Sequence, residues 1–176
     1  MKKIIFLGLF ITICFASCKK DNNNVNNQNQ TINTWTFTAG DTVYKGELLW
    51  DPLLNTLLQS NDSYTFSMLG GEANSDRTFN IVMSLTDTTF TASHYESGVV
   101  SGEGYITSFY FGHGIAGDDI YKSTNTYPGP VMNYTIESYN ASTKTLVIVF
   151  SGNAQDALGN LMPITNGKVT CKVEKM

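Results

Sequence analysis

The two histidines are the first residues to consider for chemistry, because a neutral imidazole can bind a metal or carry a proton. His94 and His113 lie far apart in the sequence, and a metal site needs three or four converging ligands. Glu96, Asp118 and Asp119 are the acids that could complete such a set. Neither the spacing nor the context of these residues is a known ligand motif. The sequence therefore predicts no metal and no cofactor, and Asp118-Asp119 is interpreted as a charged turn because it lacks the Asp-x-Asp spacing of a calcium loop.

Nucleophilic catalysis has little support in the sequence. No Gly-x-Ser-x-Gly elbow is present. Cys171 alternates with polar neighbours and shares a face with Val169 and Val173, which predicts a buried and unreactive thiol. We therefore assign no catalytic residue. A hydrolytic enzyme acting on carbohydrate is the alternative, and it would need paired carboxylates such as Glu96 and Glu103.

Aromatic residues gather in one stretch of the chain. They are Tyr105, Phe109, Tyr110, Phe111, Tyr121 and Tyr127. Exposed rings beside polar groups can stack on sugars, but we expect most rings of an all-β domain to lie in the core. The stretch 112–130 is glycine-rich and polar and is predicted to be a long loop, the kind of segment in which binding residues are common. The candidate ligand-binding residues of this loop are His113, Asp118, Asp119, Tyr121 and Tyr127.

Short strands are the elements that must position these residues. β-branched and aromatic residues alternate with polar ones between clusters of Gly, Asn, Asp and Ser, which is typical of strands and turns. Strands are expected over 34–38, 42–50, 63–68, 79–85, 105–111, 131–139, 145–150 and 168–173, with tight turns at 39–41 and 140–143. Residues 53–58 fit either one helical turn or an edge strand. The pattern predicts one all-β domain over residues 32–176, an antiparallel β-sandwich or, as the alternative, a closed β-barrel.

The N-terminus has the form of a bacterial signal peptide. Lys2 and Lys3 precede an apolar run over 4–15 that is too short to span a membrane permanently. The segment Phe15-Ala16-Ser17-Cys18 resembles a lipobox, in which the cysteine is acylated and becomes the new N-terminus. Residues 1–17 are therefore predicted to be removed, and the acyl chains on Cys18 would make a lipid membrane the partner at this end.

A linker follows the predicted acylation site. Residues 22–30 are Asn or Gln except for Val25, a composition with too little apolar surface to order the chain. Loss of Lys2 and Lys3 changes the formal net charge from −4 to −6. No segment concentrates enough Lys or Arg to neutralise several phosphates, so a nucleic-acid partner is excluded.

The C-terminal half resembles small all-β lipoproteins of the Bacteroidota. The resemblance lies in three segments: Tyr134-Thr135-Ile136-Glu137-Ser138-Tyr139-Asn140, Lys144-Thr145-Leu146-Val147-Ile148-Val149-Phe150-Ser151-Gly152, and Ile164-Thr165-Asn166-Gly167-Lys168-Val169. It implies an all-β fold and an outer-membrane location facing the periplasm or the cell surface. It implies no particular chemistry.

Together these features predict a membrane-anchored envelope lipoprotein that binds or interacts without catalysis, with a glycan or a protein as its ligand. An immunity or inhibitor lipoprotein, which would present an acidic patch to a toxin, remains open beside the hydrolytic enzyme.

Overall fold

A computed structural model describes residues 32–49, 56–60, 63–85, 89–90, 94–96, 107–113, 119–123 and 129–175. Every regular element in these ranges is a β-strand, which confirms the all-β prediction. No helix in the described ranges is long and apolar enough to cross a membrane. The signal peptide, Cys18 and the Asn-rich linker lie outside the described residues.

Twelve strands form one continuous sheet among the described residues. They are β1 (Thr34–Ala39), β2 (Thr42–Leu48), β3 (Thr56–Ser60), β4 (Ser63–Glu72), β5 (Arg77–Leu85), β6 (His94–Glu96), β7 (Ser108–His113), β8 (Asp119–Ser123), β9 (Met132–Asn140), β10 (Thr145–Asp156), β11 (Leu161–Lys172) and β12 (Glu174–Lys175). The predicted turns at 39–41 and 140–143 join β1 to β2 and β9 to β10.

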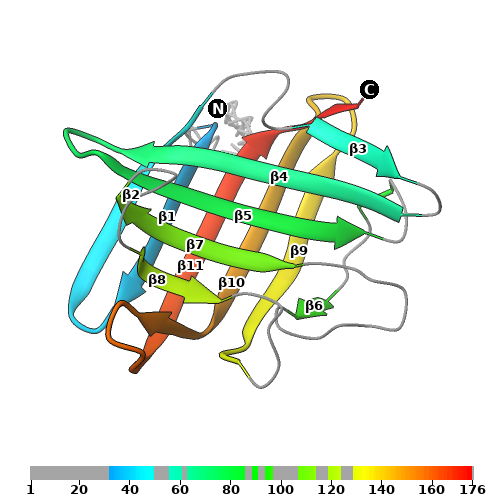
Figure 1. The fold of residues 1–176 in the computed structure, drawn as a ribbon. Coiled ribbons are helices and arrows are strands. Elements are labelled where there is room, and N and C mark those ends of the chain that lie inside the picture. The colour runs from blue at the N-terminus through cyan, green and yellow to red at the C-terminus, as the bar shows by residue number, and fades with distance from the viewer. Residues whose placement is uncertain are drawn as a thin grey trace, which may run out of the picture.

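Eight of these strands close into an antiparallel barrel in the order β11-β1-β2-β4-β5-β7-β8-β10, because β10 also pairs with β11. The favoured sandwich is therefore replaced by the alternative, a closed barrel. The barrel resembles a sandwich in one respect, because it is flattened into two layers whose strands cross steeply (Figure 1). Short pairings join the layers, namely 46–48 of β2 with 70–72 of β4 and 155–156 of β10 with 121–122 of β8. Both architectures bury alternate residues, so alternation alone does not distinguish them.

Four further strands extend this barrel. β9 lies beside β10 and carries β6 on its other side, while β3 pairs with β4 and with β12. The segment 53–58 was predicted to be either a helical turn or an edge strand. Its second half belongs to the strand β3 (Thr56–Ser60), and residues 53–55 lie outside the described ranges.

Stacked aromatic rings fill the barrel. Trp35 lies parallel to Phe79 with their centroids 4.5 Å apart, and Phe37 contacts Phe109 and Phe111 edge-on. All five side chains are buried because they occupy alternate positions on the inner faces of β1, β5 and β7. The space inside the barrel is therefore a packed core.

Glycine is required where the two layers meet over Trp35. A Cβ on Gly70 would lie 2.7 Å from Nε1 of Trp35 and 2.6 Å from the carbonyl oxygen of Glu47. Gly46 is equally close to the indole from the neighbouring strand. A strand glycine often marks such a close approach, and here it lets the indole lie flat against the wall.

Cys171 occupies the core position predicted for it, beside the equally buried Val169 and Val173. Burial raises the pKa of its thiol to about 12. The side chain is thus neutral and unreactive under physiological conditions.

The two ends of the barrel differ in what the chain does there. The rim is the end where the β1–β2, β4–β5 and β10–β11 hairpins turn and where β7 ends and β8 begins (Figure 1). The base is the opposite end, where β1 begins at Thr34, β2 and β11 end, and β9 turns into β10.

Candidate functional site

Polar side chains replace apolar ones at the last inward positions before the rim. We call Tyr44, Arg77, Tyr121 and Asp156 the polar cap. Arg77 precedes the buried Phe79 by two residues on β5, and Asp156 follows the buried Ala154 by two residues on β10. Strand periodicity points all of these side chains into the end of the barrel. The cap thus continues the core rows with groups that can hydrogen-bond.

Arg77 is the cation of the polar cap. Its Nη1 lies 3.2 Å from Oε2 of Glu72, which is the last residue of the preceding strand, and its Cζ lies 5.9 Å from the ring centroid of Tyr44. The side chains are 35 % and 21 % exposed for Arg77 and Glu72, so the ion pair alone adds little stability. The buried Nε of Arg77 has no hydrogen-bond partner in the described part of the chain. The guanidinium therefore keeps donor capacity that the fold does not use.

Two phenols complete the cap beside Arg77. The ring centroids of Tyr44 and Tyr121 are 5.9 Å apart, and Phe111 contacts both rings. Burial raises the pKa of Tyr121 to about 12, with further contributions from its hydrogen bond with Tyr44 and from the negative charge of Asp156. Tyr121 is therefore a neutral hydroxyl near pH 7 and is not a base.

Asp156 is committed to the β10–β11 turn. Its Oδ1 accepts backbone N–H bonds from Leu158 at 2.9 Å and from Asn160 at 2.8 Å, and its Oδ2 accepts the Asn160 side-chain amide at 3.0 Å. The hydrogen bonds from Asn160 are the main cause that lowers the pKa of Asp156. A carboxylate held in this way caps a turn and is poorly suited to accept a proton from a substrate.

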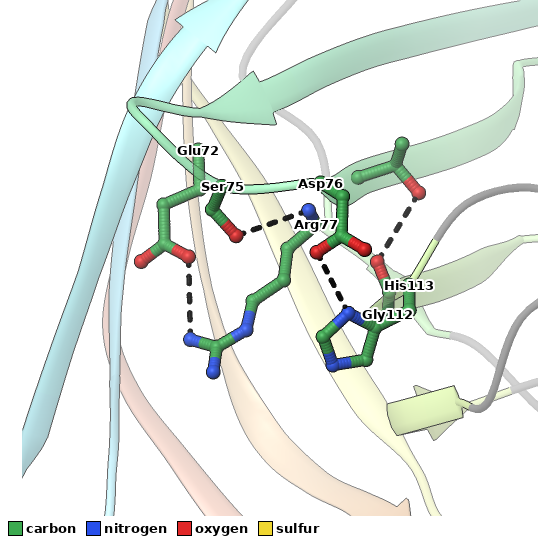
Figure 2. Close-up of polar contacts among 7 residues, drawn as sticks. Glu72, Ser75, Asp76, Arg77, Gly112 and His113 are labelled. Atoms are coloured by element: carbon green, nitrogen blue, oxygen red, sulfur yellow. Dashed lines mark hydrogen bonds and ion pairs between the residues drawn. The ribbon is translucent and has the colours of Figure 1, made fainter.

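A second charged contact joins the β4–β5 turn to the end of β7. Nδ1 of His113 lies 2.9 Å from Oδ1 of Asp76, and Figure 2 shows this pair beside the Glu72–Arg77 pair. The hydrogen bond from His113 lowers the pKa of Asp76, so this carboxylate remains ionised. No group of three metal-ligating side chains occurs among the described residues.

The predicted ligand loop does not exist as one segment. Gly112 and His113 end β7, and Asp119–Ser123 form β8, so the loop prediction was wrong over these residues. Tyr121 is an inward residue of β8, His113 lies at the rim, and Asp119 opens β8. Asp118 and Tyr127 lie outside the described residues, as do Tyr105 and Glu103. His94 and Glu96 lie in β6, at the side of the barrel and away from His113.

We expected most aromatic residues of the stretch 105–127 to lie in the core, and this is confirmed for those that the structure describes. Phe109, Phe111 and Tyr121 are buried, while Tyr110 lies on the outer face of β7 and is partly exposed.

Sequence reasoning missed Tyr44, Arg77, Glu72 and Asp156 as members of one site. The signal available for Arg77 was its phase, because it alternates with Thr78 and therefore shares the inward face of Phe79. Convergence of β2, β5, β8 and β10 depends on barrel closure, which no local pattern specifies.

Two hollows on the outer face of the barrel are weaker candidates. One measures about 590 Å³ between β9, β10 and β11, and the other about 420 Å³ beside β1 and β2. Lys168 lines both hollows, and its ammonium lies 3.1 Å from Oε2 of Glu137. The cation that these hollows share is therefore already neutralised by a protein carboxylate.

The chain matches no protein-family profile, and no curated protein or solved structure is detectably similar to it.

Proposed function

We propose that this protein is a lipid-anchored envelope module that binds a protein ligand with the rim of its barrel and has no catalytic activity. The observation that carries this proposal is a hydrogen-bonded turn at the rim that presents an apolar side chain. Leu158 is 87 % exposed at the tip of the β10–β11 turn, while the turn beneath it is fixed by Asp156 and Asn160.

The turn that carries Leu158 is already ordered before any ligand binds. Nε2 of Gln155 donates to the carbonyl of Gly159 at 3.0 Å, and the N–H of Asp156 donates to the carbonyl of Asn160 at 2.9 Å. An exposed leucine on an ordered turn loses little conformational entropy on binding, which is a property of interface anchors. Leu161 extends the same apolar surface along β11.

Three carboxylates at the rim favour binding over catalysis. Glu72 is paired with Arg77, Asp76 with His113, and Asp156 with its own turn. Acid–base catalysis needs a carboxyl group whose protonation state is poised near the working pH. These three acids are instead held in ion pairs or in hydrogen bonds to a turn.

The anchor is proposed from the sequence. Acylation of Cys18 would place the domain in the outer membrane, facing the periplasm or the cell surface. Replacement Cys18→Ala should move the protein from the membrane pellet to the soluble fraction. Membrane association that persists in this variant, after normal removal of residues 1–17, would reject the anchor.

The rim is tested by photo-crosslinking in cells that make the full chain. A photoreactive amino acid at Leu158 should give a discrete protein adduct, and the same group at Thr36 on the barrel side should give none. The adduct should weaken with Asp156→Ala, since this change frees the turn. Equal crosslinking at both positions would contradict a binding rim. If no protein adduct forms and a glycan instead stabilises the domain against unfolding, the ligand is a sugar and the proposal of a protein ligand is wrong.

A further inference from the structure

We propose that the base of the barrel is a membrane-contact face, which rests on an anionic phospholipid surface through Ile32, Leu49, Lys144 and Lys172. This inference depends on the proposed anchor at Cys18 and adds an orientation to it. With the base against the bilayer, the rim with Leu158 points away from the membrane.

Asn33 fixes the place where the chain joins the barrel. Its carbonyl accepts the N–H of Leu48 at 2.8 Å, and its Oδ1 accepts the N–H of Lys172 at 3.0 Å. The residue has a φ of 62°, a left-handed conformation that Asn tolerates better than most residues. The start of β1 and the ends of β2 and β11 are thus held level, and the linker leaves the domain at this level.

Apolar side chains flank this junction. Ile32 is 42 % exposed and Leu49 is 48 % exposed, and the N–H of Leu49 donates to the carbonyl of Leu69 at 2.9 Å. Single exposed hydrophobic residues are common on protein surfaces, so exposure alone shows little. Their position is what matters, because both lie at the end of the barrel from which the linker runs to Cys18.

Lysines occupy the neighbouring strand ends. Lys172 ends β11, and Lys144 lies in the β9–β10 turn, where its carbonyl accepts the N–H of Val173 at 2.9 Å. Glu47 is an acid at the same end of the barrel: it is the second-last residue of β2 and pairs with Thr34, and its side chain lies on the outer face of the wall. Lysine stems can lie along an apolar surface while their ammonium groups reach lipid phosphates. Each lysine close to an anionic leaflet favours contact about fivefold.

The linker makes the membrane the occupant to expect. Residues 19–31 would span about 20 Å as a coil and about 45 Å when fully extended. A base held within this distance of the bilayer experiences a high effective concentration of lipid, so contacts too weak to bind a free domain become populated. Leu158 lies at the other end of the barrel and cannot meet the same surface at the same time.

The test uses the mature chain 18–176, with the Cys18 thiol coupled to a maleimide lipid in vesicles that contain phosphatidylglycerol. Cys171 does not compete because it is buried. Lysines are acetylated with a membrane-impermeant reagent, and the modification rates are read by mass spectrometry. Lys144 and Lys172 should react at least about fivefold more slowly than in the free chain, whereas Lys122 on the barrel side should be unchanged.

Matched variants separate this face from unspecific crowding at the vesicle surface. Ile32→Asn combined with Leu49→Asn should remove most of the protection, while Val43→Asn, which changes an exposed residue near the rim, should retain it. Protection should also vanish on phosphatidylcholine vesicles. Equal protection of Lys122 and Lys172, or equal protection on both lipids, would overturn the proposal. Chemical coupling replaces acylation here, so this result is independent of the Cys18→Ala fractionation that tests the anchor.

Discussion

The middle of the barrel and its rim are built from the same inward faces of the same strands, yet they differ in chemistry. On β5, Phe79 is fully buried and stacks on Trp35, whereas Arg77, two residues earlier, pairs with Glu72 and covers Tyr44. On β10, the buried Ala154 is followed on the same face by Asp156, which caps a turn. Height along the barrel, and not the strand itself, decides whether an inward residue packs or hydrogen-bonds. We call the buried core between the rim and the base the middle layer. We infer that this middle layer carries the stability of the fold, which leaves the rim free to carry recognition.

The largest expected contrast comes from removing one ring from the middle layer. Phe79→Ala should lower the free energy of unfolding by about 3–5 kcal/mol, because it leaves a cavity against Trp35. Arg77→Met, two residues away, should cost less than about 1 kcal/mol, because the ion pair that it removes is partly exposed. Urea unfolding of residues 18–176 measures both values. Similar losses for the two variants would mean that the cap is as important for folding as the core.

A smaller contrast is expected between adjacent glycines of β4. Gly70→Ala places a methyl group against Trp35 and the carbonyl of Glu47, and overpacking of this kind costs about 1–3 kcal/mol. Gly71→Ala is the matched control, since its Cβ would meet only the carbonyl of Arg77 at an ordinary 3.9 Å. Thermal unfolding midpoints of the two variants give the comparison. An unchanged midpoint for Gly70→Ala would show that Trp35 can shift, contrary to a tightly packed middle layer.

High pH should destabilise the middle layer and the polar cap at different pH values. Burial raises the pKa of Cys171 from an ordinary 9.0 to about 12, so the unfolded chain releases this proton while the folded chain retains it. Stability should therefore fall as the pH rises from about 9 towards 12, by about 1.4 kcal/mol per pH unit for this thiol. Tyr121 contributes in the same direction, but only above its ordinary pKa of 10.0.

Substitution separates these two contributions. Cys171→Ala should flatten the dependence of stability on pH just above pH 9, and Tyr121→Phe should flatten it only above pH 10. The measurement is urea unfolding at a series of pH values, with the slopes compared and not the absolute stabilities, because Cys171→Ala also leaves a small cavity. A slope near pH 9 that is the same with and without Cys171 would contradict burial of the thiol.

The sequence predicts more of the middle layer than of the rim, for a physical reason. Alternation of apolar and polar residues marks Trp35, Phe79 and Cys171 as inward, and burial follows directly from that phase. Closure of the sheet depends on the short β2–β4 and β8–β10 pairings, which involve residues far apart in the chain and leave no local pattern. Without closure, Tyr44 and Tyr121 cannot be recognised as neighbours. β8 was missed because a five-residue strand between glycine-rich and polar stretches resembles a loop.

The smallest expected effect is that of metal ions on the rim. His113 bonds to Asp76, and the described residues hold no third ligand near this pair. A packed aromatic core also gives the domain a source of stability that needs no metal. A strong chelator, added calcium or added zinc should therefore leave the thermal midpoint of the mature domain unchanged. A site filled at a hundred times its dissociation constant would add about 2.7 kcal/mol, which moves the midpoint of a domain of this size by several degrees. If one ion produces such a shift and either His113→Ala or Asp119→Ala abolishes it, the rim is a metal site that is completed by ligands beyond those described. Recognition at the rim would then depend on the ion as well as on the ordered turn that presents Leu158.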